Sequence, residues 1–180
     1  ITASDGSLSS TQGISVTIID EDLWTQSNSI IESWNGSEYG CGGDLEMSKN
    51  GNVLVCSAIG GPGVTNIYTY LWGGTSWNAI NDVKAPYPSQ VSSQGNYGQV
   101  ISLSDDGNTL AVSAPVGDGN VWAFGWNGNS WEQKNNTDNN GGSLNNPGMF
   151  GPSGQADEFG SSLSLDGDGD RIAVGTQFGN

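Results

Sequence analysis

The sequence predicts an all-β fold made of about three copies of one four-stranded antiparallel unit, with half of a unit at each end of the chain. Three observations predict this fold. One segment recurs three times without gaps, glycine accounts for 29 of 180 residues, and apolar residues alternate with small polar ones within every copy. No long stretch has the helical spacing of apolar residues.

The first half of the unit is predicted to form a hairpin of two strands. Its copies occupy residues 41–57, 97–113 and 159–175, and each has two alternating runs joined by a short polar turn. Each turn contains Asn or Asp followed by Gly, which favours a hairpin because these residues tolerate positive φ. The three turn glycines are Gly51, Gly107 and Gly169.

The second half of the unit is predicted to form another hairpin, because a β-branched residue precedes a tryptophan by the same ten positions in each copy. The fixed position of the tryptophans favours a packing role over a role as sugar-stacking platforms. The pairs are Ile14 and Trp24, Ile67 and Trp77, and Val121 and Trp131. In the two complete units we expect strands near residues 42–48, 53–58, 66–72, 76–80, 98–104, 109–114, 120–126 and 130–134.

The repeat pattern predicts that the chain begins and ends within a unit. Residues from Ile14 to about 26 match the third and fourth strands, and residues 159–175 match the first and second. The chain is therefore expected to be a single repeat array. Its predicted divisions are a half unit at 1–38, units at 39–96 and 97–158, and a half unit at 159–180.

Residues 97–115 combine an aromatic-Gly pair, an alternating run with two serines, Asp-Gly and then Leu-Ala-Val-Ser-Ala-Pro. This pattern resembles the FG-GAP repeat of integrin α-subunit-type β-propellers, and residues 159–175 form the other good copy. The first copy departs by placing Cys41 where the aromatic residue belongs. The resemblance implies four-stranded antiparallel blades of β-propeller type, each packed against its neighbours.

Two whole units and two half units add up to three blades, whereas closed propellers have at least about four. Three explanations are open. The chain is a fragment of a longer propeller, or the half-blades pair between copies to give a ring or a filament, or the repeats stack as an open array. Because a half-blade leaves an unpaired strand edge, which natural proteins usually cover or use, we expect self-association.

The charge of the chain excludes one class of partner. Four Lys and Arg residues stand against 19 Asp and Glu residues, for a formal net charge of −15. A phosphate backbone would be repelled, so we expect no nucleic acid partner. No apolar stretch is long enough to span a membrane, so we expect no membrane insertion either.

The acidic turn Asp166-Gly167-Asp168-Gly169-Asp170 is a candidate calcium site, because alternating carboxylates in a tight glycine-rich turn can surround a hard cation. The resemblance supports this, since FG-GAP relatives often bind calcium in such loops. The same turn exists mostly without charge in the other two copies, and it lacks the bidentate Glu of an EF-hand. We therefore favour a solvated turn, with calcium at Asp166, Asp168 and Asp170 as the alternative, and expect no required cofactor.

Cys41 and Cys56 both replace residues of the repeat, and both lie in the same copy. If the aromatic and Val residues that they replace are in contact in the other copies, a disulfide could substitute for that contact; the alternative is two buried thiols. We expect the disulfide, which implies an oxidising compartment. Two glycosylation sequons, at Asn35 and Asn135, agree with an extracellular or cell-surface location.

No catalytic constellation is recognisable. The sequence contains no His, which excludes Ser-His-Asp and Cys-His catalysis, and it contains no phosphate-binding loop. The acidic residues offer many possible carboxylate pairs for glycoside hydrolysis, but no pair lies in a recognisable arrangement at the ends of strands. We therefore expect no catalytic residues and no enzymatic activity.

These observations lead to a functional expectation. The chain is expected to be a non-enzymatic, extracellular, structural or adhesive repeat protein that assembles with its own copies through half-blades. The alternative is a calcium-dependent ligand-binding or carbohydrate-binding propeller fragment of a larger adhesion protein. A protein or a glycan is the expected class of ligand, and the polar loops at 78–96 and 132–158 are the expected place for it.

Overall fold

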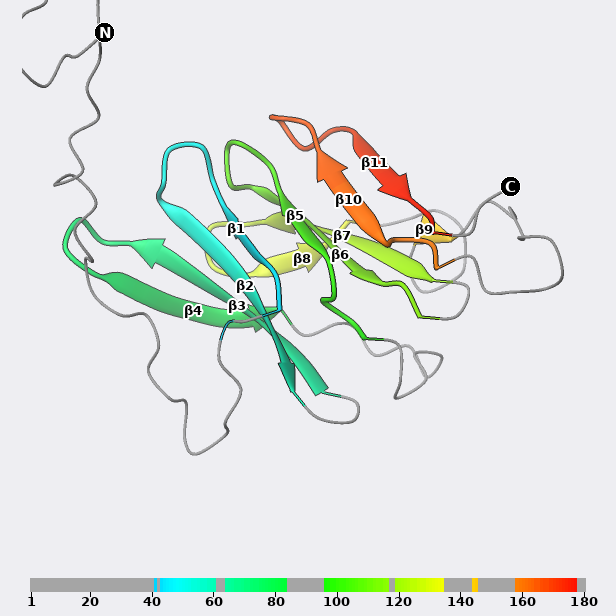
Figure 1. Cartoon of the computed structure of the whole chain (residues 1–180). Helices are drawn as coiled ribbons and strands as arrows, with labels where there is room; N and C mark the ends of the chain where they lie inside the picture. Colours follow the sequence, from blue (N-terminus) through cyan, green and yellow to red (C-terminus); the bar gives the residue numbers. More distant parts are fainter. Residues whose placement is uncertain are drawn as a thin grey trace, which may run out of the picture.

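A computed structural model describes residues 41, 43–60, 64–83, 96–116, 119–134, 144–145 and 158–177. Within these residues the protein is all-β, with eleven strands and no helix (Figure 1). No helix in this part of the chain is long and apolar enough to cross a membrane. The strands are β1 (Leu45–Met47), β2 (Val53–Gly60), β3 (Val64–Trp72), β4 (Trp77–Val83), β5 (Ile101–Leu103), β6 (Thr109–Ala114), β7 (Asn120–Trp126), β8 (Trp131–Gln133), β9 (Leu144–Asn145), β10 (Ser162–Leu165) and β11 (Ile172–Gly175).

The strands form three antiparallel sheets. Sheet A has the order β1-β2-β3-β4, and sheet B has the order β5-β6-β7-β8 with β9 also paired to β7. Sheet C contains β10 and β11. The four-stranded order and the two successive hairpins of sheets A and B confirm the predicted unit. The short strand β9 was not predicted, because it lies in a polar segment without alternation.

The first strand of each unit begins three residues later than the alternation predicts, at Leu45 and Ile101. In sheet B the reason is Gly98, which has a φ of +80° and therefore leaves the extended conformation. Its N–H still donates to the Ser113 carbonyl at 2.7 Å, so this turn is bonded to the end of β6. The alternating side chains alone carry no information about this positive φ.

The turn after the first strand is the same in all three copies. Gly51, Gly107 and Gly169 have φ values of +71°, +75° and +69°. Each of them donates its N–H to the carbonyl of the residue three positions earlier, at 2.8, 2.9 and 3.1 Å. Glycine adopts a left-handed φ at little energetic cost. The residue before each turn glycine is Asn or Asp, which also favours a turn. The predicted hairpin turn therefore has the same geometry in all three segments.

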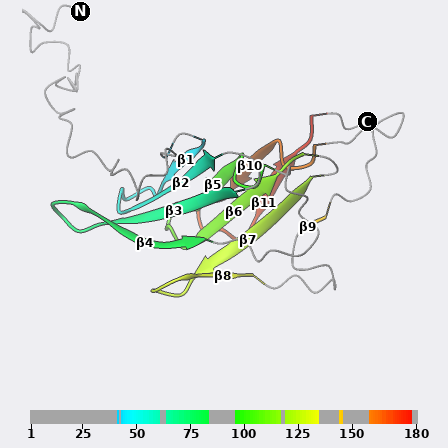
Figure 2. The same ribbon diagram turned by 90° about the horizontal axis from the view of Figure 1, so that it is seen from below.

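The sheets pack in chain order, as the two views in Figures 1 and 2 agree. The first strands β1, β5 and β10 lie side by side, with β5 contacting both of the others. Side chains satisfy backbone donors across these junctions. Ile101 N–H donates to Asp44 Oδ2 at 2.9 Å, and Leu165 N–H donates to Ser102 Oγ at 3.0 Å. The arrangement is propeller-like, with consecutive antiparallel sheets side by side.

The main hydrophobic core lies between sheets A and B. Sheet A contributes Val55, Ile67 and the half-buried Val53. Sheet B and the segment before it contribute the larger share, and the rings of Tyr97 and Trp122 pack edge to face with centroids 5.3 Å apart. The buried members from this side are Tyr97, Ile101, Leu103, Leu110, Val112, Ala114, Trp122 and Phe124. Burying this apolar surface between the sheets is the main source of stability for the array.

Candidate functional site

Sheet B presents different side chains to its two neighbours. Toward sheet A it turns the large apolar residues of the core, such as Leu110 and Phe124. Because side chains alternate along a strand, the intervening residues of β5 and β6 point toward sheet C. These are small and buried: Ser102, Thr109, Ala111 and Ser113. We call the first set the large face of sheet B and the second set its small face.

The small face allows sheet C to approach closely. A Cβ atom added at Gly160, before β10, would lie 2.9 Å from Ser113 Cβ and 3.0 Å from Val121 Cγ2. Gly160 also has a φ of +95°, so both its conformation and its surroundings require glycine. Phe159 beside it is buried. The small side chains of sheet B therefore allow the segment before β10 to lie close to sheet B.

Sheet A repeats the large face on the side away from sheet B. Val53 and Val55 point toward sheet B, so alternation places Leu54 and Cys56 on the opposite side. Across the ladder, Leu45 lies opposite Cys56, and Leu54 lies opposite Tyr70. The outer face of sheet A consists of Cys41, Leu45, Met47, Leu54, Cys56, Tyr68, Tyr70 and Trp77. In the repeat these residues take the positions of Tyr97, Ile101, Leu103, Leu110, Val112, Trp122, Phe124 and Trp131.

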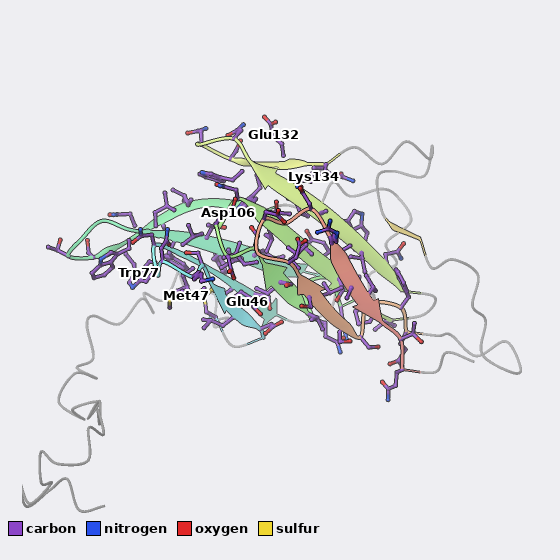
Figure 3. The ribbon with its side chains drawn as sticks, turned by 90° about the horizontal axis from the view of Figure 1, so that it is seen from above. Glu46, Met47, Trp77, Asp106, Glu132 and Lys134 are labelled. Atoms are coloured by element: carbon purple, nitrogen blue, oxygen red, sulfur yellow. A yellow bond between two sulfur atoms is a disulfide. The ribbon has the colours of Figure 1, made fainter. Side chains whose placement is uncertain are left out.

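The two faces differ in what covers them. Leu45 and Met47 are 55% and 50% exposed, whereas their counterparts Ile101 and Leu103 are 2% and 8% exposed. The apolar cluster on the outer face draws its described members from sheet A and the segment that leads into it. Figure 3 shows Met47 and Trp77 among the side chains of sheet A. This face thus has the composition of a sheet-packing surface without a second sheet among the described residues.

A disulfide joins Cys41 to Cys56 on this outer face, with Cα atoms 5.4 Å apart. The prediction of this bond is confirmed. Tyr97 and Val112, at the same two positions of sheet B, both belong to the core cluster. The disulfide therefore replaces an apolar contact within the face, and it is compatible with an oxidising compartment.

Sheet C ends in an open strand edge. β2 and β6 each pair on both sides, whereas β11 pairs with β10 alone among the described strands. All residues of β6 are buried, but those of β11 are exposed or half-buried. The face of sheet C away from sheet B carries Ser164, Arg171, Ala173 and Gly175 at the positions of the small face of sheet B, and Ser162 lies beside them. We call these five residues the small face of sheet C.

The hairpin turns of the three sheets form a hydrogen-bonded row. Lys49 N–H donates to the Asp105 carbonyl at 3.0 Å, and Asp106 N–H donates to the Gly167 carbonyl at 3.4 Å. Lys49 Nζ also forms an ion pair with Asp105 at 2.9 Å. Lys134 Nζ lies 3.0 Å from Thr109 Oγ1 and 3.4 Å from the Gly169 carbonyl. The turns thus connect the three sheets at one end of their strands, and Figure 3 labels Asp106 and Lys134 among these side chains.

The candidate calcium residues Asp166, Asp168 and Asp170 lie in the turn between β10 and β11. Asp166 Oδ1 accepts the N–H groups of Asp170 and Arg171 at 2.9 and 3.0 Å. The Arg171 N–H bond is the main cause that lowers the pKa of Asp166 below its usual value, so the carboxylate serves its own turn. Among the described residues no group of three or more His, Cys, Asp or Glu is arranged to hold a metal ion. Calcium at these three residues stays a prediction.

Several predicted features lie outside the described residues. The sequons at Asn35 and Asn135 are two of them, as is the half unit at 1–38 with its Ile14 to Trp24 pattern. The two polar loops are described only at their ends. The assignment of residues 39–96, 97–158 and 159–180 to separate blades stays a prediction. A protein or glycan ligand likewise stays a prediction.

Comparisons with known proteins find little similarity. No family model matches the sequence, and no curated protein matches it. Among solved structures, a protein described as a putative 6-phosphogluconolactonase from Bacteroides fragilis is similar, with a TM-score of 0.48 and 16% identity. The match covers 77% of this chain and 32% of the other, so the chain spans about a third of that protein's length.

This likeness contradicts two expectations from the sequence. The protein found is described as an enzyme, so the expectation of a non-enzymatic structural or adhesive protein is wrong, as is the expectation that the chain is not an enzyme. The error arose because missing catalytic motifs were taken as evidence against catalysis. The likeness assigns no reaction to this chain, and the FG-GAP resemblance stays a prediction.

Proposed function

We propose that this chain is an arc of FG-GAP-type blades that associates with a second copy of itself. The small face of sheet C in one copy packs on the outer face of sheet A in the next copy. The observation that carries this proposal is the half-exposed pair Leu45 and Met47, whose counterparts in sheet B are buried by a neighbouring sheet.

The proposal is supported by an interface that occurs twice within the chain. Large residues of sheet B pack on sheet A, and β10 of sheet C contacts β5 and β6 of sheet B. The outer face of sheet A and the small face of sheet C are the two halves of the same interface, each without its partner among the described residues. Because the two faces differ, association is head to tail.

The electrostatic pattern is compatible with such contacts. The chain carries a formal charge of −15, which would oppose association over long distances. The eight residues of the outer face of sheet A are uncharged, and the small face of sheet C carries one charged residue, Arg171, which forms an ion pair with Asp166 of its own turn. In the turn row, Asp105 and Asp166 form ion pairs with Lys49 and Arg171, and Lys134 contacts the turn of sheet C. Repulsion between copies is screened at physiological salt, while apolar contact is not.

The disulfide and the two sequons support an extracellular or cell-surface location for the assembly. A Cys41–Cys56 bond persists in an oxidising compartment and not in the reducing cytosol. Occupied sequons would be detected as a mass shift that a glycosidase removes. Unmodified Asn35 and Asn135 in protein purified from its natural source would argue against this location.

Sedimentation velocity over a range of concentrations tests the association. We expect the wild-type chain to shift from monomer to larger species as its concentration rises. Met47→Glu places a charge on the outer face at a residue that is 50% exposed, so the monomer should fold and association should be lost. Val116→Glu is the matched control, because Val116 is 45% exposed and lies outside both faces.

The proposal fails if the wild-type chain stays monomeric at every concentration. It also fails if the Met47→Glu variant associates as strongly as the Val116→Glu variant. Circular dichroism of both variants checks that each keeps its β-sheet content.

A further inference from the structure

We infer that Asn127 is a site of intramolecular deamidation, in which the backbone nitrogen of Gly128 displaces the side-chain nitrogen of Asn127 as ammonia. An Asn-Gly pair suits this reaction because glycine has no Cβ atom to hinder the approach of its own nitrogen. The described residues contain a second pair, Asn50-Gly51, and both pairs are followed by Asn. The two turns therefore form a matched comparison within one chain.

The reaction consumes one water molecule and releases one ammonia. The Gly128 nitrogen loses its proton to a base and attacks Asn127 Cγ, so an N–Cγ bond forms and the carbonyl electron pair moves onto Oδ1. The oxyanion then returns this electron pair to carbon, the Cγ–Nδ2 bond breaks, and Nδ2 leaves with the proton as ammonia. Water opens the resulting succinimide ring to aspartate or isoaspartate. The attack is favoured because one turn holds both reacting groups.

Backbone donors surround the oxygen that carries the negative charge in this reaction. Asn127 Oδ1 accepts the N–H groups of Asn129 and Ser130 at 2.9 and 2.8 Å. These bonds fold the Asn127 side chain over the turn that contains Gly128. Donors that are in place before the reaction stabilise a developing oxyanion. The carbonyl of Asn127 is therefore prepared for attack.

The nitrogen of Gly128 is free to act as the nucleophile. The turn is closed by the bond from Asn127 N–H to the Ser130 carbonyl at 3.1 Å, and the Gly128 N–H has no hydrogen bond to a described residue. Gly128 has a φ of +97°, and no atom lies within 4 Å of the position that a Cβ atom would take there. Gly128 can therefore rotate toward Asn127 Cγ without a clash with a neighbouring side chain.

The turn at Asn50 has a similar carbonyl but a restrained nucleophile. Asn50 Oδ1 accepts the Ser48 hydroxyl at 2.8 Å and the Asn52 N–H at 2.9 Å. The Gly51 N–H, however, donates to the Ser48 carbonyl at 2.8 Å. Attack by the Gly51 nitrogen would require this bond of the hairpin turn to break. The difference between the two turns lies first in the nucleophile.

The leaving group differs as well. Asn127 Nδ2 donates to Glu132 Oε1 at 2.6 Å and to Ser130 Oγ at 3.2 Å, and Figure 3 labels Glu132 on the β7–β8 hairpin. A carboxylate in contact with the leaving nitrogen can take up the proton that Gly128 loses, through an intervening water, and return it to Nδ2. Among the described residues, no acidic side chain bonds to Asn50 Nδ2.

The product weakens the hairpin that carries it. A carboxylate at residue 127 replaces the N–H donor that lies 2.6 Å from Glu132 by a like charge, and the two carboxylates repel each other. Trp131 lies beside Glu132 in β8 and donates to Thr69 Oγ1 of sheet A at 2.9 Å. Deamidation of Asn127 therefore loosens the junction between sheets A and B as the protein ages.

Peptide mass spectrometry of the ageing protein tests this inference. The purified chain is kept at neutral pH for several weeks and then digested with trypsin, which places Asn50 and Asn127 in different peptides because Lys84 lies between them. We expect Asn127 to deamidate at least about tenfold faster than Asn50 in the folded protein. Equal rates would overturn the inference.

The same measurement in concentrated urea separates the turn from the local sequence. Both pairs read Asn-Gly-Asn, so we expect the rates at Asn50 and Asn127 to converge when the chain is unfolded. If Asn127 keeps its full advantage in urea, the folded turn does not cause it and the inference is wrong.

Glu132→Gln tests the proton transfer. Glutamine keeps an oxygen acceptor for Asn127 Nδ2 but cannot carry the proton, and residue 132 is exposed, so the fold should be retained. We expect the rate at Asn127 to fall severalfold while the rate at Asn50 stays the same. An unchanged rate at Asn127 would overturn the role of Glu132.

Variants that imitate the aspartate product test its consequence. Asn127→Asp should lower the urea midpoint of unfolding, and Glu132→Gln in the same chain should recover the loss. Asn50→Asp should leave the midpoint unchanged, because Asp106 has this position in sheet B and accepts the equivalent hydrogen bonds. Equal midpoints for Asn127→Asp and Asn50→Asp would show that the product does not weaken the hairpin.

Discussion

Trp131 donates a hydrogen bond from its indole Nε1 to Thr69 Oγ1 at 2.9 Å, and this bond joins β8 of sheet B to β3 of sheet A. Thr69 is almost fully buried, so its hydroxyl depends on this contact. Trp131 also packs against Trp126 across the hairpin, with ring centroids 5.3 Å apart. The Trp131 side chain therefore stabilises both the β7–β8 hairpin of sheet B and the junction of sheet B with sheet A.

A double-mutant cycle on this pair should reveal coupling between the sheets. Thr69→Val and Trp131→Phe each remove one partner, and the double variant removes both. We expect a coupling free energy of about 1 kcal/mol, because a net hydrogen bond contributes about that much. Urea unfolding of the four proteins measures it. Thr69→Val with Trp77→Phe serves as the control cycle and should be additive.

Substitution of the turn glycines should separate backbone strain from contact between sheets. Gly51→Ala and Gly107→Ala both place a side chain at a φ above +70°, which costs about 1 kcal/mol in each case. A Cβ atom at Gly107 would also lie 2.8 Å from Val53 Cγ2, whereas the nearest atom to one at Gly51 is Met47 Sδ at 3.9 Å. Gly107→Ala should therefore lose about 1–3 kcal/mol more than Gly51→Ala. Equal losses in chemical denaturation would contradict the observed packing of this turn on sheet A.

Removal of the disulfide should destabilise the protein. The Cys41–Cys56 bond has a sequence separation of 15, and closing a loop of this size stabilises a protein by about 3 kcal/mol. The Cys41→Ser, Cys56→Ser variant should show this loss in thermal unfolding, and a reducing agent should no longer affect it. Cys41→Tyr with Cys56→Val introduces the residues found at these positions in sheet B and should recover part of the loss. If this variant recovers none of the lost stability, the outer face of sheet A is not packed like the large face of sheet B.

The stability of the protein should fall in acid partly through Asp166. Hydrogen bonds from the Arg171 backbone and side chain lower the pKa of Asp166 below its usual value of 3.8. A lowered folded pKa stabilises the protein above the unfolded pKa, and this contribution is lost as the pH falls from about 4 through the folded value. Thermal unfolding between pH 7 and pH 2 should therefore depend less on pH in Asp166→Asn. Asp170→Asn, which removes a charge from the same turn but keeps the Asp166 bonds, should retain the wild-type dependence.

Much of the fold could be predicted from the sequence because its signals are local. Asn50-Gly51 and Asp106-Gly107 identify hairpins through the conformational freedom of their residues, and the strands beside them lie where alternation places them. The disulfide could be predicted because both cysteines replace repeat residues in one copy. The start of β5 could not, since the positive φ of Gly98 leaves no mark on the alternation.

The candidate surfaces were missed for a different reason. Leu45 and Ile101 have the same character in the sequence, and only packing makes one exposed and the other buried. The bond between Trp131 and Thr69 likewise depends on how two sheets meet. A comparison of equivalent positions across the copies could have identified the outer face of sheet A, because all its members have counterparts in the core. The expectation of no enzymatic activity failed because a missing motif is weak evidence.

Each sheet turns one face toward the sheet before it and a different face toward the sheet after it, so the array has a polarity that each added repeat would preserve. A duplicated unit inserted between sheets A and B would meet these same two kinds of face on its two sides. Such a chain could lengthen by gene duplication without any new interface having to evolve. The number of repeats can therefore change in evolution while the packing between neighbouring sheets stays the same.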